Sequence, residues 1–202
     1  EAGKLVTWRK KTEPERYQTA AVKSYDFVVV GGGIAGCAAA MAAAGKGLEV
    51  ALIHDRPILG GNAASEIRVH TEGITGFSDS ILSRLNTVHW PNGSPLAAED
   101  DRKRHYTMEN IPNIHLFLEY RAFAVKTKGN KVMSVDARQT SSGEIIRFKA
   151  PLFADCTGDG WIGYWAGAEY MYGREDSAKF GEHWEKYGLL WSPAQPDNRV
   201  MG

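Results

Sequence analysis

A glycine-rich motif between two short apolar runs limits what this chain can fold into more than any other feature. The β-rich run 27–30 leads into G-x-G-x-x-G at residues 31–36. An alanine-rich stretch, 38–44, follows and favours a helix, because alanine has the highest helix propensity. A second apolar run, 50–53, closes the unit. Strand, glycine turn, helix and strand in this order predict a dinucleotide-binding βαβ unit.

The glycines of this motif each have a geometric reason. Gly31 permits the tight turn out of the strand, Gly33 lets the backbone approach a pyrophosphate, and Gly36 lets the helix lie close on the sheet. The N–H groups at the start of the helix carry a partial positive charge that favours phosphate. The cofactor-binding residues expected here are Gly31, Gly33, Ile34, Ala35 and Gly36.

The end of the second strand is where this fold places an acid that binds the cofactor ribose. His54 stands there, 23 positions after Gly31 (54 − 31), and Asp55 follows it. Either His54 binds the ribose or adenine edge, or Asp55 turns back to do so. We expect Asp55, because a carboxylate accepts from both hydroxyls whereas neutral histidine offers one acceptor. Arg56 is the nearby candidate for a 2′-phosphate.

Two further stretches carry a resemblance to a known family. The first, LGGNAASEIRVH at 59–70, contains a glycine pair that lets the backbone pass beside a long cofactor. The second, LFADCTGDGWIGYWAGAE, begins at residue 152. With the glycine motif, these stretches resemble FAD-dependent oxidoreductases of the glutathione-reductase-like superfamily. In particular, they are similar to a bacterial subgroup with RPxLGGNxxSEIRVH and TGDG motifs. The cofactor that this resemblance implies is FAD.

The resemblance also implies further cofactor contacts. The glycine pair and the residues after it run along the pyrophosphate and ribitol, and the TGDG segment meets the cofactor again. These residues are Gly60, Gly61, Asn62, Ser65, Thr157, Gly158 and Asp159. The family inserts a β-meander, here 114–149, before a parallel strand, 151–156, that returns beside the first strand. The backbone around Ala122 would then meet the adenine edge.

The fold class that follows is α/β. We expect a three-layer FAD/NAD(P)-binding (Rossmann-like) domain with a parallel sheet and an inserted antiparallel β-meander. Turn chemistry divides the meander into strands at 114–127, 132–140 and 145–149. Helices are expected at 77–89 and, as a solvent-exposed charged helix, at 96–110. The expected divisions are a polar leader at 1–23, the FAD-binding domain at 24–172 and an aromatic-rich extension at 173–202.

The amino-acid composition of the chain indicates which kinds of partner and surroundings to expect. The chain has 24 basic and 24 acidic residues and a formal net charge of zero, which predicts no nucleic-acid partner. Its two cysteines, Cys37 and Cys156, form no disulfide framework and are interpreted as packing residues. No apolar run approaches the length of a membrane span. We expect a soluble protein, cytoplasmic or, if its N-terminus is processed, periplasmic or secreted.

The expected function is an FAD-dependent oxidoreductase that performs two-electron chemistry on a small organic molecule. Alternatives are a non-catalytic nucleotide-binding or interaction protein on the same fold, and an NAD(P)-dependent oxidoreductase. The chain lacks a later strand-and-glycine segment and room for a substrate domain, so we expect an incomplete enzyme that associates with a missing C-terminal domain or with itself. No catalytic acid, catalytic base or metal-binding cluster stands out in the sequence. For Glu66, Arg68 and His70 two alternatives remain: their side chains face the cofactor, or they face solvent. The aromatics from Trp161 onward form either a packed helix or a wall facing the ligand.

Overall fold

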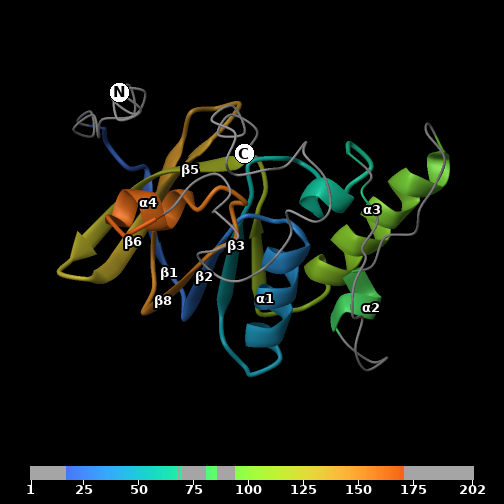
Figure 1. Ribbon diagram of the computed structural model, residues 1–202, viewed down its shortest axis with the longest axis horizontal. Helices are drawn as coiled ribbons and strands as arrows, with labels where there is room; N and C mark the ends of the chain where they lie inside the picture. The colour runs from blue at the N-terminus through green and yellow to red at the C-terminus, as the bar shows by residue number, and fades with distance from the viewer. Residues whose placement is uncertain (1–16, 68, 70–80, 86–93, 171–202) are drawn as a thin grey trace, which may run out of the picture. The chain divides into compact units, whose positions relative to one another are not determined.

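The computed structural model describes residues 17–67, 69, 81–85 and 94–170. The chain divides into two compact units, residues 1–167 and 168–202. The fold below is that of the first unit (Figure 1).

A four-stranded parallel sheet forms the centre of this unit. Its strands, in spatial order, are β4 (Ile114–Phe117), β3 (Val50–Ile53), β2 (Phe27–Val30) and β8 (Leu152–Asp155). The residues of β3 are all buried, as are three of the four in β2. Both strands read as continuous apolar runs because both faces of the sheet are covered. The expected strand at 151–156 is confirmed as β8, parallel to and beside β2.

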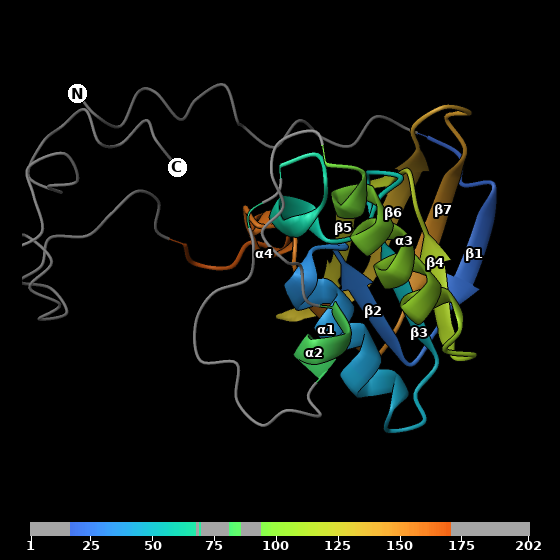
Figure 2. The ribbon, with the colours of Figure 1, turned by 90° about the vertical axis from the view of Figure 1, so that its right-hand side faces the viewer.

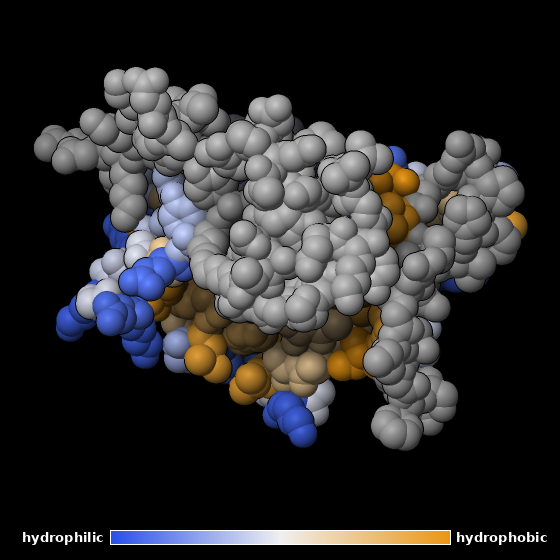
Figure 3. Space-filling model, in the orientation of Figure 1, coloured by the Kyte–Doolittle hydropathy of each residue, from blue (hydrophilic) through white to orange (hydrophobic). Residues whose placement is uncertain are grey.

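Helix α1 (Ile34–Ala44) links β2 to β3 and packs on the sheet. It begins at the glycine motif itself, four residues before the alanine-rich stretch expected to be helical. Small side chains let it lie close, because an added Cβ on Gly36 would stand 1.8 Å from the Gly31 carbonyl oxygen. The outward side of the helix is also alanine, so apolar surface shows over it in Figure 3.

A second sheet lies on the face of the parallel sheet opposite α1 (Figure 2). Its spatial order is β1 (Ala21–Ser24), β7 (Ile145–Lys149), β6 (Lys131–Gln139) and β5 (Tyr120–Lys128). Strands β5, β6 and β7 pair antiparallel and confirm the meander. Strand β1 joins β7 in parallel at the edge. The end of the stretch interpreted as a leader therefore adds a strand to this sheet.

The expected single strand at 114–127 is wrong. The chain turns at Leu118 and Glu119, and Glu119 has a left-handed φ of 59°. Strand β4 before the turn pairs with β3 in the parallel sheet, and β5 after it belongs to the meander. The Tyr120 N–H donates to the His54 carbonyl at 2.9 Å. The turn therefore carries β5 away from the parallel sheet at the point where β3 ends.

Two hydrophobic cores result from this arrangement, one on each face of the parallel sheet. Alternate residues of a strand point to opposite faces. Val29 and Leu52 pack toward the helices with Met41 and Met108. Val28, Val30 and Ile53 pack toward the meander with Val135, Ala137 and Phe148. These cores separate three layers, as the sequence predicts.

Besides the short 3-10 helix η3 (Gly61–Ala63) in the loop after β3, three more α-helices complete the described part of the unit. These are α2 (Ile81–Leu85), α3 (Pro95–Glu109) and α4 (Trp161–Ala166). Helix α2 lies within the expected stretch 77–89, whose other residues lie outside the described ones. In α3, Ser94 caps the N-terminus by accepting from the Leu96 N–H at 3.3 Å. None of the described helices combines the length and apolar character needed to cross a bilayer.

The prediction that α3 is a solvated helix is wrong for one of its faces. Ala97, Asp101, Arg104 and Met108 are buried. Their spacing of four, three and four residues places them on one stripe of the helix. That stripe packs against α2 and the loop after β3, so two charged side chains enter the interior.

Candidate functional site

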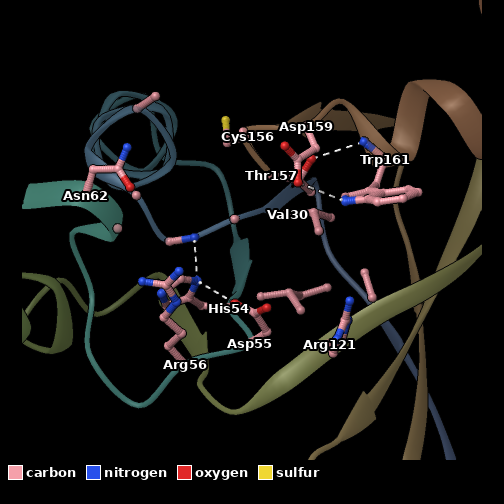
Figure 4. A pocket seen from close by; sticks show the side chains of 18 of the residues that line it. Val30, His54, Asp55, Arg56, Asn62, Arg121, Cys156, Thr157, Asp159 and Trp161 are labelled. Atoms are coloured by element: carbon pink, nitrogen blue, oxygen red, sulfur yellow. Dashed lines mark hydrogen bonds and ion pairs between the residues drawn. The ribbon is translucent and has the colours of Figure 1, made fainter. Parts of the chain in front are cut away.

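A cavity of about 710 Å³ opens where β2, β3 and β8 end. Its volume lies within the range of about 300–1,000 Å³ typical of small-molecule sites, and the carboxyl ends of parallel strands are where α/β folds bind ligands. Four segments supply most of its lining: the glycine turn (residues 31–36), the β3 loop (residues 54–66), the start of β5, and the TGDG turn (residues 157–160) with α4. Figure 4 shows side chains from these segments around it.

Most of the residues that the sequence predicts for the site are brought together here. Fourteen of them line the cavity: Gly31, Gly33, Ile34, Ala35, His54, Asp55, Arg56, Gly60, Gly61, Asn62, Ala122, Thr157, Gly158 and Asp159. Two do not. Gly36 lies behind the turn against the Gly31 carbonyl, and the Ser65 N–H donates to the Asp101 carboxylate.

The glycine turn is shaped by close backbone contacts. Gly31 has φ +108°, and an added Cβ there would lie 2.0 Å from the Cys156 carbonyl oxygen. Gly33 differs, because its φ of −67° and ψ of 178° suit any residue, and apart from its two chain neighbours no described residue lies within 4 Å of an added Cβ. No described side chain caps α1, so its first N–H groups are available to bind an anion.

The β3 loop lies directly against this turn. The Gly60 N–H donates to the Gly32 carbonyl at 2.8 Å, and Gly33 and Gly60 form an isolated β-bridge. An added Cβ on Gly61 would stand 3.1 Å from the Gly33 Cα. The two glycine segments therefore form one continuous backbone wall of the cavity.

His54 ties these two segments together with its ring. Its Nδ1 accepts from the Gly32 N–H at 3.0 Å, and its Nε2 lies 3.0 Å from the Ile58 carbonyl oxygen. A carbonyl only accepts, so these partners place the proton on Nε2 and leave the ring neutral. Burial lowers the pKa of His54 below its ordinary value, which agrees with a neutral ring. Both nitrogens are engaged by the backbone, which leaves no acceptor for a ribose.

Asp55 stands beside His54 with its side chain 49% exposed. Its carboxylate lines the cavity and lies 3.7 Å from His54 Nδ1, too far for a hydrogen bond. Arg56 also lines the cavity, but its Nη1 donates to Glu66 at 3.2 Å. His54 and Asp55 are the two candidates for the ribose contact. Of these, Asp55 has the carboxylate oxygens that could accept from the ribose hydroxyls.

The TGDG turn is fixed by Asp155 at the end of β8. One carboxylate oxygen accepts from the Thr157 N–H and hydroxyl at 3.2 and 2.7 Å, and the other from the Gly163 N–H at 2.9 Å. The Thr157 hydroxyl accepts in turn from the Trp161 N–H at 3.1 Å. The side chains of this turn thus serve its own geometry and the start of α4.

Two tryptophans from the aromatic-rich stretch line the cavity, and a wall facing the ligand was one of the two alternatives that the sequence left open for this stretch. The indoles of Trp161 and Trp165 stack at 5.4 Å between ring centroids and form part of its wall. Their i,i+4 spacing after the TGDG turn was the available signal, because such residues share one helix face. The other additional lining residues are Val30, Gly32, Ile53, Ala63, Val69, Tyr120, Arg121, Phe123 and Cys156.

Groups that could act as nucleophiles or metal ligands are few in the described residues. Burial raises the pKa of the Cys37 thiol to about 12 and also raises the pKa of Cys156, so neither is a ready thiolate. Within the described ranges no three His, Cys, Asp or Glu side chains gather as metal ligands would. Glu66 pairs with Arg56; Arg68 and His70 lie outside the described residues.

The His54 contacts predict a pH dependence of stability. The folded-state pKa lies below the unfolded one, so the unfolded chain takes up a proton first as pH falls. The contribution of His54 to the free energy of unfolding is therefore fully present above about pH 6.5, the ordinary histidine pKa. This contribution is lost as the pH falls from about 6.5 toward the folded-state pKa. His54→Asn places an amide oxygen near the position of Nδ1 but does not titrate. Asp55, Arg56 and Glu66 carry the charges that act on the ring, and they are the same in both proteins.

The measurement is chemical unfolding of both proteins between about pH 5 and 8. The other five of the six histidines are common to both, so the difference between the curves reports His54. We expect His54→Asn to show the flatter dependence on pH. Parallel curves would contradict the assigned ring state.

Comparison with solved structures finds this fold in proteins of low sequence identity. A geranylgeranyl bacteriochlorophyll reductase-like protein of Thermoplasma acidophilum matches with a TM-score of 0.51 and 21% identity, over 73% of this chain and 43% of that one. FrdA of the E. coli quinol fumarate reductase matches with a TM-score of 0.50 and 16% identity, over 68% of this chain and 33% of that one. At such identities the likeness shows the fold alone.

Curated proteins of similar sequence share one name, tRNA uridine 5-carboxymethylaminomethyl modification enzyme MnmG. The protein from Finegoldia magna is 27% identical over 170 residues, which are 73% of this chain and 26% of that protein. The protein from Alkaliphilus oremlandii is 31% identical over 153 residues, 65% of this chain and 24% of that protein. The chain spans about a quarter of the length of these relatives.

These relatives overturn one expectation from composition. The zero net charge predicts no nucleic-acid partner, yet the relatives are named as tRNA-modifying enzymes. Net charge sums over the whole chain, whereas nucleic acids respond to the local arrangement of charge. The exclusion of nucleic acid is therefore wrong.

The profile of one protein family extends over most of the chain. It is described as FAD dependent oxidoreductase and matches residues 26–199. This range includes the whole βαβ unit, the meander and the TGDG turn. The chain therefore belongs to the FAD-dependent oxidoreductase family, and its cofactor is FAD.

Proposed function

We propose that this chain holds the adenosine and pyrophosphate part of FAD in an enzyme that performs two-electron oxidation or reduction. The observation that carries the proposal is the open space beside Gly33 at the uncapped N-terminus of α1. A side chain at Gly33 would occupy this space, and the N–H groups at the start of α1 lie next to it. Such a space suits a pyrophosphate. FAD, when bound, supplies the hydride chemistry of its flavin ring.

The residues around the cavity divide the binding between them. Gly33 and Gly61 lie against each other and present bare backbone to one side of the pyrophosphate position. Asp55 accepts from the ribose hydroxyls, and the backbone at Ala122 meets the adenine edge. The TGDG turn closes the cavity from the β8 side. The contribution of these residues is to bind and orient the cofactor, since their polar groups either fix the backbone or face the ligand.

The substrate has two candidates of different chemistry. The names of the relatives favour tRNA, whereas the resemblance seen in the motifs favours a small organic molecule. The two are separated by adding unfractionated tRNA to the longest form of the protein that its gene encodes. Binding that weakens with salt, as phosphate contacts require, together with tRNA-dependent flavin oxidation or reduction, supports tRNA. Flavin turnover with small molecules and no tRNA binding supports the other candidate.

Gly33→Val tests the cofactor site directly. The backbone at Gly33 accepts a side chain without strain, and the added methyl groups would enter the space that the pyrophosphate needs. We expect loss of bound flavin, read from the absorbance spectrum, with an unchanged circular dichroism spectrum. Ala42→Val adds the same branched side chain on the exposed side of α1 and should keep the flavin. Stoichiometric flavin in folded Gly33→Val would refute the site.

Asp55→Ala tests the ribose contact. Loss of hydrogen bonds to a charged group costs about 1.5–3 kcal/mol, which weakens FAD binding by roughly 10- to 150-fold. His54→Asn keeps an acceptor for the Gly32 N–H and should cost less. Glu109→Ala removes an exposed carboxylate away from the cavity and serves as the charge control. Titration of apoprotein with FAD gives the order, and a larger loss for His54→Asn would reverse the assignment.

A further inference from the structure

Helix α3 buries two charged side chains that do not line the cavity. Arg104 is 1% exposed and Asp101 is 7% exposed, and Arg104 Nη1 lies 3.0 Å from Asp101 Oδ1. Burying charges is costly, and apolar residues of similar volume often pack as stably. The pair therefore calls for a reason beyond the packing of α3.

The guanidinium of Arg104 reaches backbone on two other segments. Its Nη1 donates to the Leu59 carbonyl at 2.9 Å, and its Nε donates to the Leu85 carbonyl at 3.2 Å. It also lies so close to Gly60 that an added Cβ there would stand 2.6 Å from Nη1. The beginning of the glycine pair is thus shaped against this side chain.

The carboxylate of Asp101 holds the other end of the same segment. Both of its oxygens accept from the Ser65 N–H, at 3.1 Å each. Between these anchors lie residues 60–63, all of which line the cavity, and Gly60 and Gly61 touch the glycine turn. The charged pair therefore forms hydrogen bonds with the β3 loop at Leu59 and at Ser65. These two residues flank the part of the loop that lines the cavity.

We propose that Asp101 and Arg104 are positioning residues for FAD: they hold residues 59–65 where Gly61 can flank the pyrophosphate. This inference rests on the FAD site proposed above. The rigid fork of arginine carries donors in several directions, so it binds Leu59, Leu85 and Asp101 together. Lysine presents its donors from one atom and cannot reproduce that fork. A more mobile loop pays an ordering cost when the ligand binds, which lowers affinity.

The test uses Arg104→Lys and Asp101→Asn in the longest form of the protein that its gene encodes. Both substitutions nearly preserve volume, and Arg102→Lys makes the first change on the exposed side of the same helix. Three quantities are measured: the melting temperature of the apoprotein, the Kd for FAD, and amide hydrogen exchange. We expect the Kd to rise about tenfold or more for each buried variant, which corresponds to at least one lost hydrogen bond to a charged group. The control should keep the Kd of the unsubstituted protein.

Hydrogen exchange separates positioning from general stability. Faster exchange confined to residues 59–65, with β2 and β3 still protected, supports the inference. An unchanged Kd with a lowered melting temperature would show that the pair only stabilises the fold and would overturn it. If one variant does not fold, the other carries the measurement. If the unsubstituted protein binds no FAD, the proposed function fails, and this inference falls with it for that separate reason.

Discussion

The fold depends on how closely the backbone packs at the glycine turn. The Gly31 Cα faces the Cys156 carbonyl, and Gly36 faces the Gly31 carbonyl, with no room for a Cβ at either position. These contacts bring β2, α1 and β8 together at one corner of the parallel sheet. The cavity exists because the same turn leaves the Gly33 side open.

Polar groups near the cavity fall into two sets with different tasks. His54, Asp101 and Arg104 are buried and form hydrogen bonds with backbone of the β3 loop and the glycine turn; Arg104 also donates to the Leu85 carbonyl of α2. Asp55 is half-exposed, and its carboxylate lines the cavity. This division explains how irregular loops form a defined wall, because buried backbone needs partners and here side chains supply them.

Local pattern predicted the central elements well. The glycine motif fixed β2, α1 and β3, and the returning strand and the meander followed from apolar runs and turn residues. Contacts distant in sequence could not be read in this way. The role of His54 depends on Gly32 and Ile58, the burial of Arg104 depends on the β3 loop, and the break at Glu119 depends on β4 pairing with β3. Each of these is decided by tertiary contact rather than by local propensity.

The nature of the proposed cofactor site also explains why the family of this chain is clearer than its substrate. The part of the cavity wall proposed to hold the pyrophosphate consists of glycine backbone and the first N–H groups of α1. Such a wall recognises a dinucleotide whatever molecule reacts at the other end of the cofactor, and one fold can therefore serve many chemistries. The relatives that match this chain share this part, about a quarter of their own length. Substrate choice in such a fold depends on side chains near the reacting group, and the glycine turn that defines the fold does not supply them.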